Sequence, residues 1–246
     1  MNFRKSLWMD RYVRYDFTFE EREAILIFPG EIKKTGRWML KTEYFDAFPQ
    51  LEAAMVAEGF HLACLRNINR WGLDADQDAK FRFRDFLMKE FGLSDRCIPI
   101  GMSCGGLHAV KLAARHPEMV EKLYLDAPVI NILSCPFGMG KPTQIEEETK
   151  QEALDALGLT MSGMIAYREH PLDKLGALIE NRIPLALVWG DSDRIVSWEE
   201  NAQLVREAYE KTDIPALYIC KPGCDHHPHG PTNDADLAAL ISFLTA

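Results

Sequence analysis

Residues 97–106 have the sequence Cys-Ile-Pro-Ile-Gly-Met-Ser-Cys-Gly-Gly, a short apolar run that ends in the pattern Gly-x-Ser-x-Gly. The residues that follow are apolar at helical spacing until Pro117, which ends the pattern. A strand that turns this tightly into a helix forces the residue at its apex, Ser103, into an unfavourable backbone conformation and leaves no room for side chains two positions away. Those two positions hold Gly101 and Gly105. The stretch therefore predicts a strand, a sharp turn that exposes the Ser103 hydroxyl, and a helix.

The turn at Ser103 places a hydroxyl where it can act as a nucleophile, because the amide of Cys104 opens the helix and faces an oxyanion formed there. A second amide donor is expected from the loop after the strand that ends at Phe28. This makes Gly30 and Glu31 the candidates for the rest of the oxyanion hole. The helix N-terminus also favours a thiolate at Cys104, so we expect this cysteine to react with alkylating agents.

Length and charge limit the class of protein. The chain has 246 residues, enough for one α/β domain with a modest insertion, and a net charge of −9 with a pI near 5.3. This acidic balance argues against a nucleic-acid partner, because a phosphate-binding surface needs concentrated lysine and arginine. No apolar run is long enough to span a bilayer and no signal-peptide core follows Met1, so we expect a cytoplasmic protein without a membrane partner. The oligomeric state stays open.

Apolar runs alternate with amphipathic helical patterns along most of the chain, which indicates an α/β fold with a mostly parallel sheet and helices on both faces. An alternating run at 13–19 predicts an edge strand, and a continuous apolar run at 24–28 predicts a parallel strand buried on both faces. This alternation of apolar runs and helical patterns ends after residue 130. We therefore assign 1–130 and 182–246 to the core domain and 131–181 to a helical lid insertion. The other strands are expected at 61–65, 97–100, 123–125, 185–189 and 216–220, and the helices at 43–58, 74–91, 107–114, 198–210 and 237–244.

Side chains that follow two of the predicted strands provide the partners that a serine nucleophile needs. These are a base to take the hydroxyl proton and a carboxylate to orient the base. The candidates after the last two strands are Asp191, Asp193, His226, His227 and His229. Because the carboxyl ends of parallel strands meet at one edge of a sheet, the chain order Ser, Asp, His predicts a catalytic triad at that edge.

Four motifs at these intervals carry a resemblance to a known family: Gly-Met-Ser-Cys-Gly-Gly from residue 101, His-Pro-Glu from 116, Gly-Asp-Ser-Asp from 190 and Gly-Cys-Asp-His from 223. Over nearly its whole length the sequence resembles the α/β-hydrolase superfamily of serine hydrolases and esterases. The resemblance implies the α/β-hydrolase fold, with Ser103 as nucleophile, Asp193 as acid and His226 as base. A narrower similarity, over 36–38, 44–49 and 226–229, is to small bacterial hydrolases associated with carbohydrate breakdown.

Alternatives remain for the acid and for the base. The other candidates are Asp126 and Asp191 for the acid and His227 and His229 for the base, although Asp191 is better placed to form a turn. Residues 224–229 could also form a zinc cluster. Adjacent ligands on one short loop close a tetrahedral site poorly, so we expect no metal. No phosphate-cradling glycine loop follows any strand, and we expect no organic cofactor.

Basic and aromatic residues after two predicted strands suggest where a substrate would bind. Trp38 and Trp71 could stack on a sugar or aryl ring, while Arg66 and nearby cations hold hydroxyls or a carboxylate. The alternative is that these segments are ordinary solvated loops. The sequence thus predicts a serine carboxylesterase for small polar esters, with acylated carbohydrates as one class. A peptidase, a thioesterase and a non-catalytic ligand-binding protein of the same fold are the alternatives.

Overall fold

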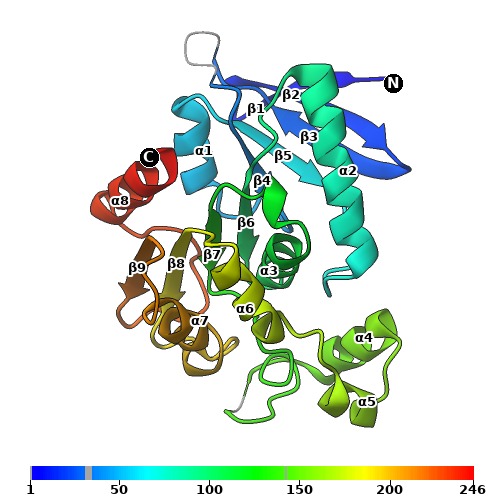
Figure 1. The fold of residues 1–246 in the computed structure, drawn as a ribbon, viewed down its shortest axis with the longest axis vertical. Helices are drawn as coiled ribbons and strands as arrows, with labels where there is room; N and C mark the ends of the chain where they lie inside the picture. Colours follow the sequence, from blue (N-terminus) through cyan, green and yellow to red (C-terminus); the bar gives the residue numbers. More distant parts are fainter. Residues whose placement is uncertain (1, 31–34, 142) are drawn as a thin grey trace.

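The protein is organised around one sheet (Figure 1). A computed structural model describes residues 2–30, 35–141 and 143–246, in which nine strands have the order β1-β2-β3-β5-β4-β6-β7-β8-β9. All strands from β5 to β9 along this order run parallel, which confirms the expected mostly parallel sheet. The strands are β1 Arg4–Trp8, β2 Tyr12–Phe19, β3 Arg22–Ile27, β4 Trp38–Lys41, β5 His61–Leu65, β6 Ile98–Met102, β7 Leu123–Asp126, β8 Leu185–Gly190 and β9 Ala216–Lys221.

The first three strands correct the sequence prediction. β2 is not an edge strand, because β1 pairs antiparallel with it. The apolar run at 24–28 forms most of β3, which is antiparallel to both β2 and β5 rather than parallel. A continuous apolar run indicates that both faces of the strand are covered, but it does not indicate the direction of the strand. Since Ile27 pairs with Leu62 near the start of β5, the chain after β3 leaves the sheet at the amino edge of the parallel strands.

The sequence pattern does not predict β4, which lies between β5 and β6. All four of its residues are buried, and the ammonium of Lys41 forms a buried ion pair with Glu52 of α1. A four-residue strand that ends in lysine is too short for a periodicity signal. The helix expected over 43–58 is correspondingly shorter, and α1 spans only Gln50–Ala57.

Helices cover both faces of the sheet (Figure 1). One apolar cluster joins the sheet to α2, α3, α6 and α7, and a second joins the opposite face to α1 and α8. None of the helices in the described parts of the chain has the length and apolar composition needed to cross a membrane. The helices other than α1 are α2 Asp74–Phe91, α3 Gly105–Arg115, α4 Glu147–Leu157, α5 Met161–Ala166, α6 Leu175–Glu180, α7 Ala202–Tyr209 and α8 Asp234–Thr245.

The segment 131–181 contains α4, α5 and α6. In Figure 1, α4 and α5 lie apart from the sheet, whereas α6 lies beside α3 and α7. Leu175 and Leu178 of α6 belong to the main apolar cluster, so the last part of the segment packs into the body of the domain. A third cluster joins α4 and α5 to Trp71, Cys104 and Leu107, and it lies directly beside the turn at Ser103.

The close approach of α3 to the chain after β7 gives a stability prediction. A Cβ atom on Gly106 would lie 2.5 Å from Cβ and 2.9 Å from Cα of Pro128, so Gly106→Ala forces the backbone apart. We expect this variant to lose about 1–3 kcal/mol of unfolding free energy in urea. The matched control is Gly176→Ala in α6, where no atom lies within 4 Å of an added Cβ; it should be neutral or stabilising by about 1 kcal/mol. Equal stability of both variants would contradict the packing described.

Candidate active site

The turn between β6 and α3 has the geometry that the sequence predicts. Ser103 has a φ of +52°, in the left-handed region that side-chain-bearing residues rarely adopt. Main-chain hydrogen bonds hold it there: the Ser103 amide donates to the carbonyl of Asp126 at 3.1 Å, and the Ser103 carbonyl accepts from the amides of Val129 and Gly106, both at 2.9 Å. The strained residue is thus supported by the end of β7, the neighbouring strand.

His226 lies between Ser103 and Asp193. Its Nε2 atom is 3.0 Å from the Ser103 hydroxyl oxygen, and its Nδ1 atom is 2.7 Å from Oδ2 of Asp193. The other carboxylate oxygen of Asp193 accepts hydrogen bonds from the amides of Ile195 and Val196 at 2.9 and 2.8 Å. These contacts fix the carboxylate, and the carboxylate fixes the imidazole ring with one nitrogen directed at the hydroxyl.

Asp225 connects the loop that carries the acid to the loop that carries the base. One of its carboxylate oxygens accepts the amides of both His226, at 2.8 Å, and Arg194, at 2.9 Å. The Arg194 amide, the His226 amide and the Arg194 guanidinium together lower the pKa of Asp225 to about 2, against the opposing effect of burial. A carboxylate that stays ionised therefore ties the two loops together next to the imidazole.

The alternative acid and bases occupy other positions. Asp191 lies in the turn that follows β8, and its carboxylate accepts the amide of Gly223 in the neighbouring loop at 2.6 Å. His227 is exposed and stacks on Phe48, with ring centroids 5.6 Å apart. His229 is buried and has Nδ1 3.5 Å from the carboxylate of Asp126.

The three neighbouring histidines are also the residues that could hold a metal ion. Among the described parts of the chain, one potential ligand atom from each of His226, His227 and His229 lies within 4.8 Å of the others. Both nitrogens of His226, however, already contact Ser103 and Asp193. Binding a metal through this ring would break one of those contacts, so the cluster fits a proton-transfer site better than a metal centre.

The prediction of the second oxyanion donor is wrong for Gly30 and falls outside the described residues for Glu31. Gly30 follows β3, and β3 runs opposite to the strands that carry Ser103 and its partners. The loop therefore leaves the sheet at the far edge. The sequence prediction assumed that the strand at 24–28 runs parallel to the strand before Ser103. Because β3 is antiparallel to β5, the loop after β3 cannot supply the oxyanion donor.

The loop after β4 lies at the correct edge instead. Thr42 is fully buried, and its hydroxyl oxygen lies 2.8 Å from the carbonyl oxygens of both Ile100 and Gly105, which share its single proton. This clamp holds the loop against the turn: a Cβ on Gly105 would lie 3.4 Å from Cβ of Glu43. Tyr44 follows, with a φ of +54°. Sequence reasoning missed these residues because it missed the short strand that positions them.

The thiol of Cys104 differs from the expectation. Its side chain lies in the third apolar cluster, beside Trp71 and Leu107, rather than at a solvated helix end. Burial raises the pKa of the Cys104 thiol, and it outweighs the opposing effects of Tyr44 and Arg70. A thiol with a raised pKa in an apolar cluster is a poor nucleophile, so the burial of Cys104 argues against the expected reactivity.

The residues expected to bind substrate divide into three cases. Trp38 is fully buried at the amino edge, where its indole donates to the carbonyl of Ser94 at 2.9 Å, so it cannot stack on a substrate. Trp71 is at the correct edge but only 1% exposed, and its indole donates to Glu152 of α4 at 3.0 Å. Arg66 is exposed at the correct edge and pairs with Glu23 at 3.0 Å. Only Arg66 is accessible to a ligand.

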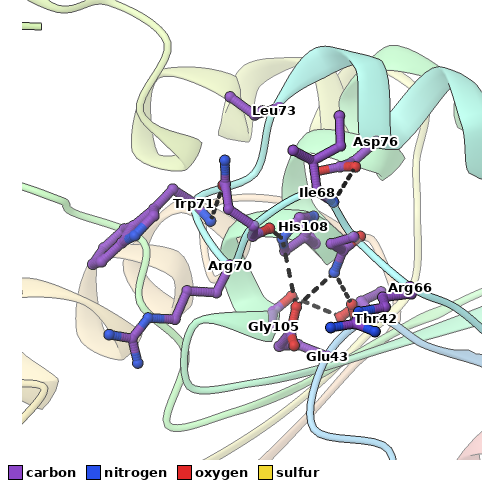
Figure 2. Close-up of polar contacts among 12 residues, drawn as sticks. Thr42, Glu43, Arg66, Ile68, Arg70, Trp71, Leu73, Asp76, Gly105 and His108 are labelled. Atoms are coloured by element: carbon purple, nitrogen blue, oxygen red, sulfur yellow. Dashed lines mark hydrogen bonds and ion pairs between the residues drawn. The ribbon is translucent and has the colours of Figure 1, made fainter. Parts of the chain in front are cut away.

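A cavity of about 390 Å³ with a mixed polar and apolar lining lies along the carboxyl ends of β4 and β5. Figure 2 shows the polar contacts among residues that line the cavity and their neighbours. In it, Arg70 and Trp71 point away from the cluster around Glu43. Asn67 holds one wall, since its amide donates to the carbonyl of Thr42 and to the carboxylate of Glu43, both at 2.6 Å. The lining residues are Glu23, Ile25, Thr42, Glu43, Tyr44, Phe45, Cys64, Leu65, Arg66, Asn67, Ile68, Asn69 and Arg70.

A buried lysine supports this wall from behind. Lys80 of α2 is 1% exposed and its ammonium contacts the side-chain oxygen of Asn67. Burial lowers the pKa of Lys80 to about 8, although the nearby Asp76 and Glu43 oppose the shift. With its oxygen and its amide both engaged, Asn67 is fixed, and it holds Glu43 at the border between the cavity and the turn.

Helix α4 is attached to the same region. Arg70 forms two hydrogen bonds with Glu152 of α4, at 3.0 and 2.5 Å, and Glu152 also accepts from the indole of Trp71. This polar contact and the third apolar cluster connect the segment 131–181 to the chain that borders the Ser103 turn.

No protein-family model matches the sequence. Solved structures of similar fold include an S-formylglutathione hydrolase from Agrobacterium tumefaciens, with a TM-score of 0.66 at 15% identity over 98% of this chain and 96% of that chain. A dipeptidyl peptidase 4 from Porphyromonas gingivalis (0.65, 16% identity) and a puromycin-hydrolysing peptidase from Mycobacterium tuberculosis (0.67, 14%) match over 91% and 89% of this chain. Of their own lengths only 33% and 36% are covered, about a third. The chain has the α/β-hydrolase fold.

The environment of Cys104 predicts its reactivity. Iodoacetamide applied to the native protein should leave Cys104 unmodified, because its thiol is buried and its raised pKa disfavours the thiolate. The exposed Cys220 serves as the positive control in the same sample. Mass spectrometry of tryptic peptides distinguishes the two sites. Modification of Cys104 as fast as that of Cys220 would contradict the burial described.

Proposed function

We propose that this chain is a serine hydrolase that cleaves carboxylic esters through an acyl-enzyme intermediate. The observation that carries the proposal is the chain of contacts from the Ser103 hydroxyl to His226 and from His226 to Asp193, at 3.0 and 2.7 Å. These distances are within the hydrogen-bond reach that a general base needs. The strained backbone of Ser103 adds a feature that a ligand-binding protein of this fold does not require.

The reaction follows from the roles of these groups. Ser103 Oγ attacks the ester carbonyl carbon while its proton moves to Nε2 of His226, and Asp193 stabilises the imidazolium that forms. The C–O bond to the alcohol breaks as His226 returns this proton to the leaving oxygen. Water then attacks the acyl group with His226 again as base, which releases the acid and restores the Ser103 hydroxyl.

We assign the oxyanion hole to the amide of Cys104 and to an amide of the loop after β4, from Glu43 or Tyr44. The hydrogen bonds of the described residues leave these three amides without an acceptor. The clamp made by Thr42 holds the β4 loop against the start of α3, so both sources of donors are fixed before a substrate binds. Donors preorganised in this way stabilise developing negative charge without reorganisation during the reaction.

Cleavage of an ester or a thioester is favoured over cleavage of a peptide by the extent of the structural similarity. The S-formylglutathione hydrolase matches over 96% of its length, whereas the peptidases contain about twice as much additional chain as the part that matches. A serine peptidase and a thioesterase remain the alternative functions, because the same three side chains serve all of these reactions.

The cavity beside the β4 loop supports a polar substrate. The carboxylate of Glu43, the amide of Asn69 and the guanidinium of Arg66 line it, together with the ring of Phe45. Hydroxyl groups of a carbohydrate pair well with such mixed donors and acceptors. We propose that small polar esters, including acylated carbohydrates, place their polar part here, and that α4 and α5 cover the other side as a lid.

A fluorophosphonate probe tests the nucleophile. The wild-type protein should be labelled at Ser103, and Ser103→Ala should abolish both labelling and ester hydrolysis, since no other group in the site can form the acyl-enzyme. His226→Ala should lower kcat by about 10³-fold or more. Activity should be unchanged after dialysis against a chelator. Unlabelled wild-type protein would favour the ligand-binding alternative, and loss of activity with the chelator would favour a metal enzyme.

A substrate panel tests the proposed role of the cavity. We expect acetylated sugars to be hydrolysed with a higher kcat/KM than long-chain esters, acyl-CoA or aminoacyl amides. Arg66→Ala should raise KM for the sugar esters about tenfold, the effect of one lost charge-assisted hydrogen bond. The matched control is Arg182→Ala. Arg182 lies just before β8, is exposed, and pairs with Asp213. A preference for long-chain esters or amides that Arg66→Ala does not change would overturn the polar-substrate assignment.

A further inference from the structure

Asp126 is the last residue of β7, paired with Met102 at the end of β6. Its backbone carbonyl holds the Ser103 amide, so its main chain already supports the nucleophile turn. Its side chain does not act as the acid, because His226 contacts Asp193 instead. The carboxylate is nevertheless almost completely buried, and a buried charge requires compensating partners.

Apart from the Tyr124 hydroxyl of β7, which donates to Oδ2 at 3.4 Å, the partners of the Asp126 carboxylate come from the loop that carries His226 and from the residue before it. We define residues 222–230 as the histidine loop. Oδ2 of Asp126 accepts a hydrogen bond from the amide of Gly230, at the end of this loop. Oδ1 lies 3.5 Å from Nδ1 of His229 and 3.7 Å from the ammonium of Lys221, the residue that precedes the loop. One carboxylate therefore contacts both ends of the histidine loop.

Lys221 also binds the histidine loop directly. Its ammonium donates to the carbonyls of Pro228, at 2.7 Å, and Gly230, at 3.4 Å, and its side chain is 1% exposed. Burial opposes the ionisation of Asp126, but His229, Lys221 and the Gly230 amide outweigh it and lower the pKa of the carboxylate. Asp126 and Lys221 are thus a charged pair enclosed between β7 and the histidine loop.

The charged pair and Asp225 hold the chain on either side of His226, the proposed base. Asp225 fixes the amide of His226 from the side of the acid loop, while Asp126 and Lys221 fix the chain that follows, through Gly230. The His229 ring, which contacts Asp126, also packs against the ring of His226 with centroids 4.7 Å apart. Because the main chain of Asp126 also holds Ser103, a single residue links the nucleophile to the base.

We propose, on the basis of the function proposed above, that Asp126 and Lys221 are positioning residues that set the distance between His226 and Ser103. Neither side chain contacts the reacting atoms. Removing the Asp126 charge leaves the Lys221 ammonium buried without its counter-ion, so the histidine loop must shift to solvate it. A displacement of about 1 Å at a catalytic base can cost about 10²-fold in rate.

The test compares Asp126→Asn, Lys221→Met and the double variant with the wild type. Asparagine keeps an acceptor for Gly230 and has nearly the same size, so the change is mainly one of charge. Each single variant should lower kcat about 10- to 100-fold with KM unchanged. The kcat of the double variant should be no lower than that of the less active single variant, because the two residues act as a unit. The control is Glu121→Gln, which removes a carboxylate paired with Arg37 and should retain wild-type kcat.

Stoichiometric labelling with a fluorophosphonate separates positioning from folding. Rates expressed per labelled Ser103 should still show the loss of kcat if Asp126 positions the base. Wild-type kcat per labelled site, or effects of the two substitutions that multiply in the double variant, would overturn the inference while leaving the triad intact. If the wild-type protein itself neither labels nor hydrolyses esters, the proposed hydrolase function fails instead, and the two failures are therefore distinguishable.

Discussion

The positive φ of Ser103 is the constraint on which the site depends. A residue with a side chain costs about 1–3 kcal/mol in such a conformation, so its surroundings must hold it there. Here the carbonyl of Asp126 and the amide of Val129 bind its main chain, and Gly106 allows α3 to lie against Pro128. The result is a hydroxyl held at the carboxyl edge of the sheet, within 3.0 Å of His226.

Much of this arrangement could be predicted from local sequence. The Gly-x-Ser-x-Gly stretch specifies its own backbone, because small residues are required where the strand meets the helix; the structure shows that Gly101 and Gly106 are the tightest positions, more so than Gly105. Strands that are long or fully apolar, such as β8, and helices with a clear period, such as α2, appear where expected. The rule that functional loops follow parallel strands predicted that Asp193 and His226 lie near Ser103, and in the structure His226 contacts both of the others.

The remainder depends on pairing between distant segments, which a single sequence does not report. The direction of β3 decides that Gly30 lies at the wrong edge, and this direction is set by its pairing with β5. The four residues of β4 became a strand through neighbours far away in the chain, so Trp38 is buried and the loop at Thr42 reaches the site. Trp71 and Cys104 were expected at a solvated surface, but the segment 131–181 covers both.

The most direct measurement is a crystal structure of the protein after reaction with a small phosphonate ester, a stable mimic of the tetrahedral intermediate. We expect phosphorus bonded to Ser103 Oγ, with His226 still in contact with Asp193. The phosphoryl oxygen should accept hydrogen bonds from the amide of Cys104 and from an amide of the loop after β4, at about 2.7–3.1 Å. An adduct on another residue, or an oxygen directed away from both amides, would contradict the proposed roles of Ser103 and of these amides.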